Sequence, residues 1–198
     1  MKIIVLKQGV HADNYPESGP IKNHMKPICS TVTLIKADKN IIVDPGNVGF
    51  EDEILAELKK QGLEPEDIDI VICTHRHFDH VHNMHLFKNA IRVHNKEIHE
   101  TNGNLIVYKE GPVDIDVLGI KLISTPGHMA EHVSVVVESE GKKTVIAGDA
   151  FVPEYLDLLD ETGKKSALKI IDIADEIIPG HGDIIKKEEF DEIRRRLE

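Results

Sequence analysis

Short apolar segments rich in β-branched residues recur along the chain and predict a series of strands. They occupy residues 3–6, 30–35, 40–44, 68–73, 90–93, 105–108, 120–123, 133–137 and 143–147. Several are apolar at almost every position, which is typical of strands buried on both faces of a sheet.

Three segments with helical periodicity separate or follow these strands, at residues 51–62, 162–175 and 186–198. The first ends at Gly62, a residue that favours a helix C-terminus. The last places Phe190, Ile193 and Leu197 at positions i, i+3 and i+7, on one face of a helix. Strands and helices together predict a mixed fold, α+β (α/β), in which helices cover a sheet.

The chain length bounds the number of domains. A chain of 198 residues suffices for one domain with a buried core, and we expect a single domain over residues 1–198. Residues 10–27 are polar and rich in turn-forming residues, so a long irregular loop is predicted there. Loops of this length are often functional, although disorder would give the same pattern.

Charge and cysteine content narrow the possible partners. The chain carries 24 Lys and Arg against 35 Asp and Glu, a net charge of −11, which disfavours binding to long nucleic acids. The apolar start has only four residues, too few for a signal peptide or a membrane span. Cys29 and Cys73 lack the number and spacing of a disulfide framework. We therefore expect a cytoplasmic protein without a membrane partner, and the oligomeric state stays open.

Four strand-like segments end directly at a possible metal ligand. The ligands that follow them are His75, His128, Asp149 and His181. Strand ends that meet at one edge of a sheet can bring such residues together. A single histidine of this kind is more often a surface or core residue. The pattern occurs four times, however, three times with a glycine beside the ligand that allows a tight turn, and this repetition favours a site.

The spacing within residues 73–85 divides the ligands between two cations. His75 and His77 are two residues apart, so in an extended segment they leave the same face and can share one ion. Asp79 and His80 are adjacent and point differently, which suits a second ion. Adding the other ligands gives His75, His77 and His128 at the first ion, and Asp79, His80 and His181 at the second, with Asp149 bridging. Both sets leave room for water, as catalytic sites do.

These residues resemble the motifs of the metallo-β-lactamase fold superfamily. The segment His75-Arg76-His77-Phe78-Asp79-His80 matches its H-x-H-x-D-H motif, and elements resembling TPGH, GD and PGHG follow in the family order. The resemblance implies a four-layer αββα sandwich with the metal ions at one edge of two facing sheets. It also implies that Asp44 supports the ligands from behind.

Departures from the family pattern narrow the resemblance. Asp149 stands where antibiotic-hydrolysing members have Cys or lack the bridging carboxylate, so the chain is more similar to the glyoxalase-II, lactonase and nuclease branches. Beyond one helix, nothing resembling the helical extension of glyoxalase II is predicted after His181 in this sequence. His82 stands where a small residue is usual, and we predict His82 and His85 on a helix that begins after His80, outside the metal sets.

Two divalent ions roughly 3.5–4 Å apart can share a water and lower its pKa towards about 7. We therefore expect a metal-dependent hydrolase that uses a metal-bridging hydroxide on a small ester, thioester or lactone, with Asp79 as the catalytic carboxylate. The nitrogen and oxygen ligands accept zinc, our first choice, or iron or manganese. The alternatives are a phosphodiesterase or nuclease, and an iron protein with oxygen chemistry or a metal sensor.

Further candidates concern the proton donor and the substrate contacts. His132 could act as a general acid or could cap the end of a strand or helix. Seven residues near predicted strand ends or in the long loop could line a pocket, although packing or exposed positions explain each of them better: Tyr15, His24, His94, His99, Tyr108, Phe151 and Tyr155.

Overall fold

The structure, a computed structural model, describes residues 1–11 and 27–198. The loop predicted over residues 10–27 lies mostly outside the described residues, as do the candidates Tyr15 and His24. Within the described part of the chain, no helix has the length and apolar character needed to cross a membrane.

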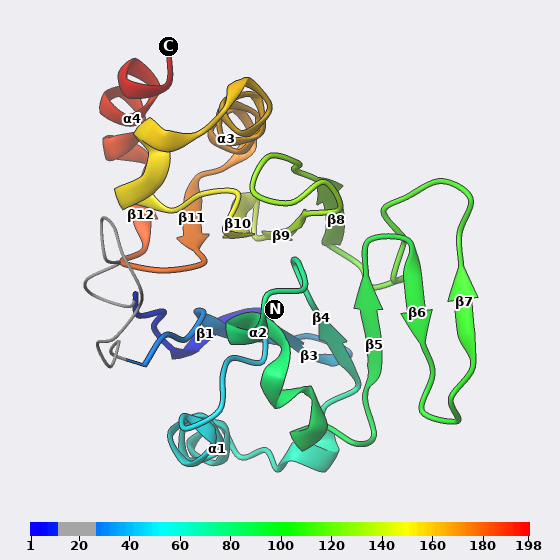
Figure 1. The fold of residues 1–198 in the computed structure, drawn as a ribbon. Helices are drawn as coiled ribbons and strands as arrows, with labels where there is room; N and C mark the ends of the chain where they lie inside the picture. Colours follow the sequence, from blue (N-terminus) through cyan, green and yellow to red (C-terminus); the bar gives the residue numbers. More distant parts are fainter. Residues whose placement is uncertain (12–26) are drawn as a thin grey trace, which may run out of the picture.

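Two sheets form the centre of the molecule (Figure 1). The first has the order β1-β2-β3-β4-β5-β6-β7 and consists of β1 (Lys2–Lys7), β2 (Val32–Lys36), β3 (Asn40–Val43), β4 (Ile70–Ile72), β5 (Ile91–His94), β6 (Glu97–His99) and β7 (Leu105–Val107). The second has the order β12-β11-β10-β9-β8 and consists of β8 (Ile120–Ser124), β9 (Val133–Ser139), β10 (Lys142–Gly148), β11 (Glu176–Pro179) and β12 (Ile185–Lys186). Strands β3, β4 and β5 are parallel neighbours, and so are β10 and β11.

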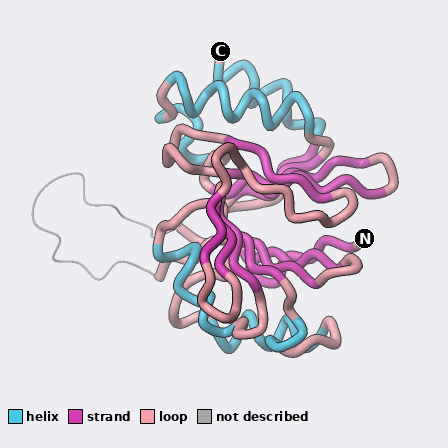
Figure 2. Tube along the Cα trace, turned by 90° about the vertical axis from the view of Figure 1, so that its right-hand side faces the viewer, coloured by secondary structure: helices cyan, strands magenta, loops and turns pink. Residues whose placement is uncertain are grey.

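Helices cover the outer face of each sheet. The α-helices are α1 (Glu51–Lys60), α2 (Phe78–Val81), α3 (Glu161–Ile173) and α4 (Phe190–Leu197), and the 3-10 helices are η1 (Pro65–Asp67), η2 (His82–Leu86), η3 (Pro153–Leu158) and η4 (Lys187–Glu189). Figure 2 shows helices above and below two stacked sheets. The predicted four-layer αββα sandwich is confirmed.

Successive side chains on a strand point to opposite faces of the sheet and pack into different apolar layers. On β3, Ile41 and Val43 point into the core between the sheets, whereas Ile42 packs beneath α1 with Ile54 and Leu58. The same alternation on β9 and β10 supplies the layer under α3 and α4. Strands with both faces buried carry apolar residues at consecutive positions, which explains why these segments lack a two-residue alternation in the sequence.

Most predicted elements are present, with three corrections. The helix predicted after His80 instead begins at Phe78, so α2 contains Asp79 and His80, and His82 to Leu86 form the 3-10 helix η2. In the segment 186–198, predicted as one helix, the α-helix α4 begins only at Phe190 and is preceded by the 3-10 helix η4. Strands β6 and β12, of three and two residues, were not predicted.

Candidate metal centre

The segments that follow β4, β8, β10 and β11 converge at one edge of the sandwich. They carry His75, His128, Asp149 and His181, and α2 adds Asp79 and His80. The side chains form two neighbouring groups, each of which could hold a metal ion. The prediction that separate strand ends deliver these residues to one place therefore agrees with the geometry.

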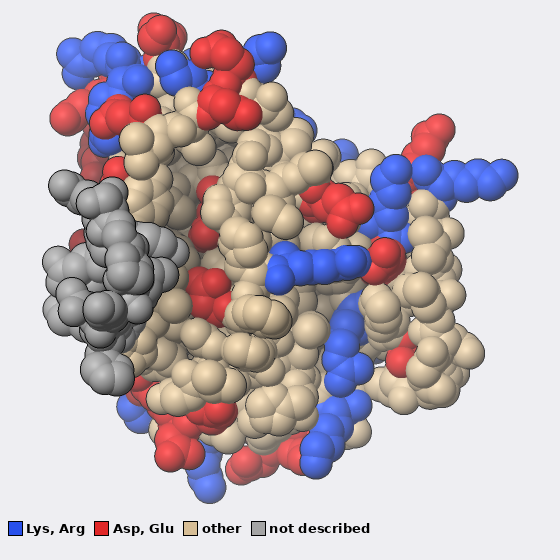
Figure 3. Space-filling view, in the orientation of Figure 1, with Lys and Arg blue, Asp and Glu red and all other residues tan. Residues whose placement is uncertain are grey.

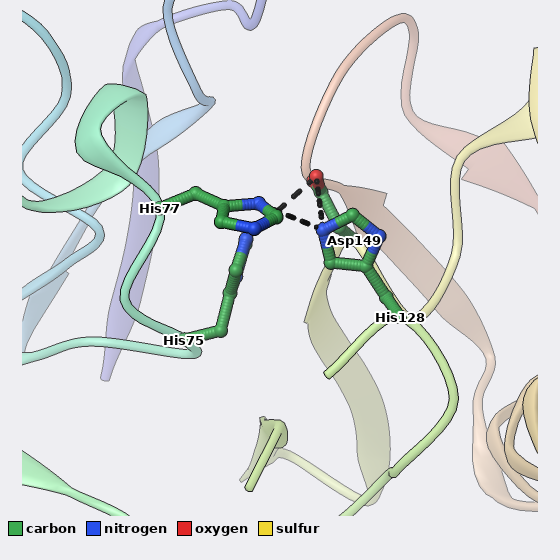
Figure 4. Close-up of side chains that lie close together, drawn as sticks. All are labelled: His75, His77, His128 and Asp149. Atoms are coloured by element: carbon green, nitrogen blue, oxygen red, sulfur yellow. Dashed lines mark hydrogen bonds and ion pairs between the residues drawn. The ribbon is translucent and has the colours of Figure 1, made fainter. Parts of the chain in front are cut away.

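The first group consists of His75, His77, His128 and Asp149, whose potential ligand atoms all lie within 4.8 Å of one another. Figure 4 shows the four side chains pointing toward a common point from three separate parts of the chain. His128 Nε2 lies 3.0 Å from His77 Nδ1 and 3.4 Å from Asp149 Oδ2. His75 Nε2 lies 3.8 Å from the same carboxylate oxygen.

The second group consists of Asp79, His80 and His181. Asp79 Oδ2 lies 3.3 Å from His181 Nε2 and 3.6 Å from His80 Nε2. Two imidazoles and one carboxylate thus face each other at distances that a cation between them would satisfy.

Asp149 lies between the two groups and faces each with a different oxygen. Its Oδ2 atom is directed to His75 and His128, and its Oδ1 atom lies 3.2 Å from His80 Nε2 and 3.5 Å from His181 Nε2. A carboxylate in this position could contact two cations at once.

Unpaired buried atoms test whether a cation fits. His75 Nε2, His80 Nε2 and Asp149 Oδ1 are buried and make no hydrogen bond to any described residue. Leaving a buried polar atom unpaired costs about 1–3 kcal/mol, and here three such atoms converge. Because all the donors are nitrogen or oxygen, a divalent cation would satisfy them together.

Asp44 fixes the segment that carries the ligands. Its carboxylate accepts hydrogen bonds from the Thr74 backbone N–H (2.8 Å), the Thr74 hydroxyl (2.7 Å) and His80 Nδ1 (2.8 Å). Asp44 itself is buried and adopts φ 51°, in the left-handed region that Asp and Asn tolerate better than most residues. The supporting position expected for Asp44 agrees with these contacts.

The electrostatics attract positive charge to the boundary between the two groups. Burial alone would lower the pKa of His80, but the carboxylates of Asp149 and Asp44 raise it well above its usual range. Burial alone would raise the pKa of Asp149, but the neighbouring His80 and His181 hold it well below its usual range. Burial lowers the pKa of His75, which keeps this imidazole neutral, the form that binds metals.

Glycines permit close approach at two of these turns. Gly148 has φ 54°, and a Cβ atom there would come within 3.0 Å of the His132 ring. Gly180 does not have a positive φ, so its backbone conformation alone does not require glycine. A Cβ atom on Gly180 would lie 2.8 Å from the carbonyl carbon of Gly148 and still closer to Asp149 Oδ1, so the turn before His181 can pass Asp149 only without a side chain.

The remaining histidines of the 73–85 segment and His132 lie outside the two groups. His82 Nδ1 lies 2.7 Å from Asn47 Oδ1, and His85 Nδ1 lies 3.0 Å from the carbonyl oxygen of His82. His132 is fully buried, stacks against His75 with ring centroids 5.0 Å apart, and contacts Thr125 Oγ1 at 3.0 Å. His132 thus stands behind His75, which does not suit a general acid that must reach substrate.

A pocket of about 420 Å³ opens over the two groups. Of the described candidates for substrate contact, Tyr155 lines it, whereas Phe151 is buried in the core under α3. His94 lines a neighbouring pocket beside Arg76, and His99 and Tyr108 lie on the β6–β7 hairpin or at its end. The pocket lining also contains residues that the sequence did not single out: His11, Ile28, Phe78, Val152 and Leu159.

His11 is the most informative of these missed residues. Its ring lies 4.4 Å from that of His181 and 4.9 Å from that of Tyr155, measured between centroids. Its position, four residues beyond β1, follows no motif and no helical or strand periodicity. The bridge between Val10 and Cys29 and the contact of His181 Nδ1 with the Val10 carbonyl oxygen (3.2 Å) place this segment beside the site.

Comparison with known proteins agrees with this fold and site. The sequence profile of the metallo-beta-lactamase superfamily matches residues 28–181. Metallo-beta-lactamase domain-containing protein 1 of Xenopus laevis is 34% identical over 164 residues, which cover 77% of this chain and 70% of that protein. A Methanocaldococcus jannaschii protein named probable metallo-hydrolase is 32% identical over 159 residues, covering 76% and 74% of the two chains.

A solved structure gives the same result for the fold. A Thermotoga maritima protein assigned to the metallo-beta-lactamases superposes with a TM-score of 0.71 at 24% identity, over 93% of this chain and 98% of that one. The profile match covers most of the sequence, and the sandwich is the fold that the superfamily resemblance implied. The chain belongs to the metallo-β-lactamase superfamily.

Proposed function

We propose that this protein is a metal-dependent hydrolase that cleaves a small ester, thioester or lactone at a site holding two divalent ions. The observation that carries the proposal is the position of Asp149, whose two oxygens face two separate groups of ligand atoms on the floor of one pocket. A structural metal site needs one closed set of ligands, whereas two open sets at a pocket floor suit catalysis.

In this proposal His75, His77 and His128 hold one ion, Asp79, His80 and His181 hold the other, and Asp149 contacts both. When bound, the ions would lower the pKa of a shared water towards about 7 and would polarise the substrate oxygen. The imidazoles on the buried side, His75 and His80, stay rigid because protein surrounds them. His77 and His128, both exposed, face the pocket from which substrate enters.

Asp79 is the residue to which we assign catalysis. It lines the pocket and presents Oδ2 to His181, and the neighbouring His181 and His80 lower its pKa against the raising effect of burial. Its carboxylate is therefore ionised at neutral pH. It can orient the attacking water through a hydrogen bond and accept the proton that the water releases.

Zinc is our first choice for the two ions because nitrogen and oxygen donors with open positions suit it, and iron and manganese accept the same donors. Elemental analysis of the purified protein tests this choice directly. About two zinc ions in a colourless protein would support hydrolysis. Iron with a visible absorption band would favour oxygen chemistry, and zinc hydrolysis would then be abandoned.

A substrate screen tests the reaction. The metal-loaded protein is assayed with esters, lactones and thioesters, and with bis-p-nitrophenyl phosphate for the phosphodiesterase alternative. We expect Asp79→Asn to lose at least about a hundredfold in kcat, within the range of general-base contributions, while circular dichroism shows an unchanged fold. Asp114→Asn, which changes an exposed carboxylate outside the pocket lining, serves as control. Activity of Asp79→Asn equal to that of the control would refute the assigned role.

A further inference from the structure

The side chain of Phe78 is unusual in being both aromatic and exposed. It lies between His77 and Asp79 in sequence, lines the pocket, and has 73% of its surface accessible. An exposed large aromatic ring gains nothing from the apolar core, and such rings are common where a protein contacts a ligand.

A second ring holds Phe78 in place. The imidazole of His82, one helical turn later, stacks on the Phe78 ring with centroids 4.9 Å apart and planes inclined by 11°. His82 Nδ1 is in turn fixed at 2.7 Å from Asn47 Oδ1, and Asn47 Nδ2 donates to the Ile28 carbonyl at 2.8 Å. The outer face of Phe78 is thus a rigid aromatic surface at the pocket.

This arrangement gives a reason for the histidine at position 82, where the superfamily pattern has a small residue. A glycine there would leave one face of the Phe78 ring unsupported. His82 itself is absent from the pocket lining, so its effect on a ligand would act through the ring that it supports.

The rest of the pocket wall favours an uncharged, apolar ligand group. Ile28, Val152 and Leu159 line it, together with Tyr155, whose ring meets His11 edge-on at 4.9 Å. Among the described lining residues there is no Lys or Arg to pair with a negatively charged substituent. Figure 3 shows carboxylates within a hollow, with mainly uncharged residues on the side away from the grey segment.

We propose that the Phe78 ring, supported by His82, is a stacking surface for a planar aromatic group on the acyl part of the substrate. The inference rests on the proposed function, which it narrows to aryl-substituted esters, thioesters or lactones. A flat ring on Phe78 would leave the attached carbonyl beside Asp79 and His77, the sequence neighbours of Phe78 that also line the pocket. Stacking adds to simple burial and depends on ring geometry.

Two esters with the same leaving group isolate the contribution of stacking. Trifluoroethyl phenylacetate and trifluoroethyl cyclohexylacetate have similar size, but only the first has a flat ring. Each rate is divided by the rate of hydroxide-catalysed hydrolysis of the same ester, which removes the difference in carbonyl reactivity. We expect the protein to prefer the phenyl ester by about three- to tenfold in kcat/KM, the range set by aromatic stacking. Phe78→Leu should bring this ratio close to one by raising KM for the phenyl ester, with little change in kcat, and Phe78→Tyr should restore it.

His82→Ala tests the supporting role, with an intermediate ratio expected because the ring remains but loses its fixed orientation. Tyr108→Ala removes an exposed aromatic residue beyond the end of β7, outside the pocket lining, and should leave the ratio unchanged. A ratio near one in the unmodified protein, or a ratio that Phe78→Leu does not alter, would overturn the proposal.

Ligand binding separates this inference from the proposed reaction. Fluorine NMR can follow 4-fluorophenylacetate added to the protein, with 4-fluorocyclohexylacetate as the non-planar counterpart. Binding of the aromatic acid that Phe78→Leu weakens would support the stacking surface even if no ester were hydrolysed, in which case only the proposed reaction fails. Ester hydrolysis without any dependence on Phe78, in either binding or KM, would reject the stacking surface and leave the reaction standing.

Discussion

His80 Nδ1 donates a hydrogen bond to Asp44 Oδ2 at 2.8 Å, beneath the floor of the pocket. A carboxylate can only accept, so this contact keeps a proton on Nδ1, and in the neutral form of His80 that binds a metal the lone pair of Nε2 is directed at Asp149 and Asp79. The same carboxylate fixes Thr74, the residue before His75. Asp44 therefore orients one residue from each group, although it belongs to neither.

Replacement of Asp44 by Asn tests this orientation. Asn accepts the left-handed backbone of position 44, so the fold should persist. Its amide N–H₂, however, cannot accept the His80 proton, and the other histidine tautomer would turn a protonated Nε2 toward the site. We expect affinity for the ion at the second group to fall about 10- to 100-fold, measured by metal content after equilibration with graded chelator concentrations. Asp38→Asn, exposed and distant in sequence from every predicted ligand, should bind metal like the unmodified protein.

Single histidine replacements test the division into two groups. His128 Nε2 faces Asp149 Oδ2, and His181 Nε2 faces Asp149 Oδ1. We therefore expect His128→Ala and His181→Ala each to retain about one ion per chain by elemental analysis, because the other group keeps its own ligands. Loss of both ions in both variants would show one cooperative site. Retention of two ions in either variant would remove that histidine from the ligand set.

The strands and the meeting of side chains at their ends could be predicted from the sequence, whereas several contacts between distant elements could not. The ligand positions follow strand ends, so a strand pattern together with H-x-H-x-D-H spacing was enough to anticipate which side chains meet. The burial of β3 on both faces was likewise visible, because Ile41, Ile42 and Val43 are consecutive apolar residues.

Contacts made across the fold could not be anticipated in this way. His11 reaches the pocket because the segment before it pairs with Cys29 and contacts the turn at His181, and the His82–Phe78 stack depends on a helix that begins three residues earlier than the pattern indicated. Strand β12 has two residues, too few for any periodicity. Local pattern predicts elements, whereas these features arise from packing between elements.

The two cysteines should be unreactive in the folded protein. Both are buried, and burial raises the pKa of Cys29 to about 11 and that of Cys73 further still. Because the thiolate is the reactive form, a raised pKa leaves very little of it at pH 8. We expect an aromatic disulfide reagent to modify both thiols at least about 100-fold more slowly in the folded chain than in denaturant. Rapid labelling of one cysteine without denaturant would contradict the burial of that thiol.

Gly180→Ala gives the sharpest test of the position of Asp149. Alanine has no backbone difficulty at position 180, where φ is not positive, so the added methyl group acts only through contact. That methyl group would overlap Asp149 Oδ1 and press on the Gly148 carbonyl carbon at 2.8 Å. Because overpacking strains the fold, we expect the free energy of unfolding to fall by about 1–3 kcal/mol. Since Asp149 Oδ1 faces His80 and His181, we also expect chelator competition to show at least a tenfold lower affinity for the ion at the second group.

The matched control for Gly180→Ala is Gly103→Ala, in the turn between β6 and β7. Gly103 has φ 92° and open space around its would-be Cβ atom, so alanine there introduces backbone strain without touching the site. We expect it to cost about 1 kcal/mol in stability and to bind both ions with unchanged affinity. If Gly180→Ala were destabilised to the same extent but kept its affinity for both ions, the position of Asp149 between the two groups would have no part in metal binding. If only Gly180→Ala bound metal more weakly, the result would show that Asp149 takes its position between the two groups because residue 180 has no side chain.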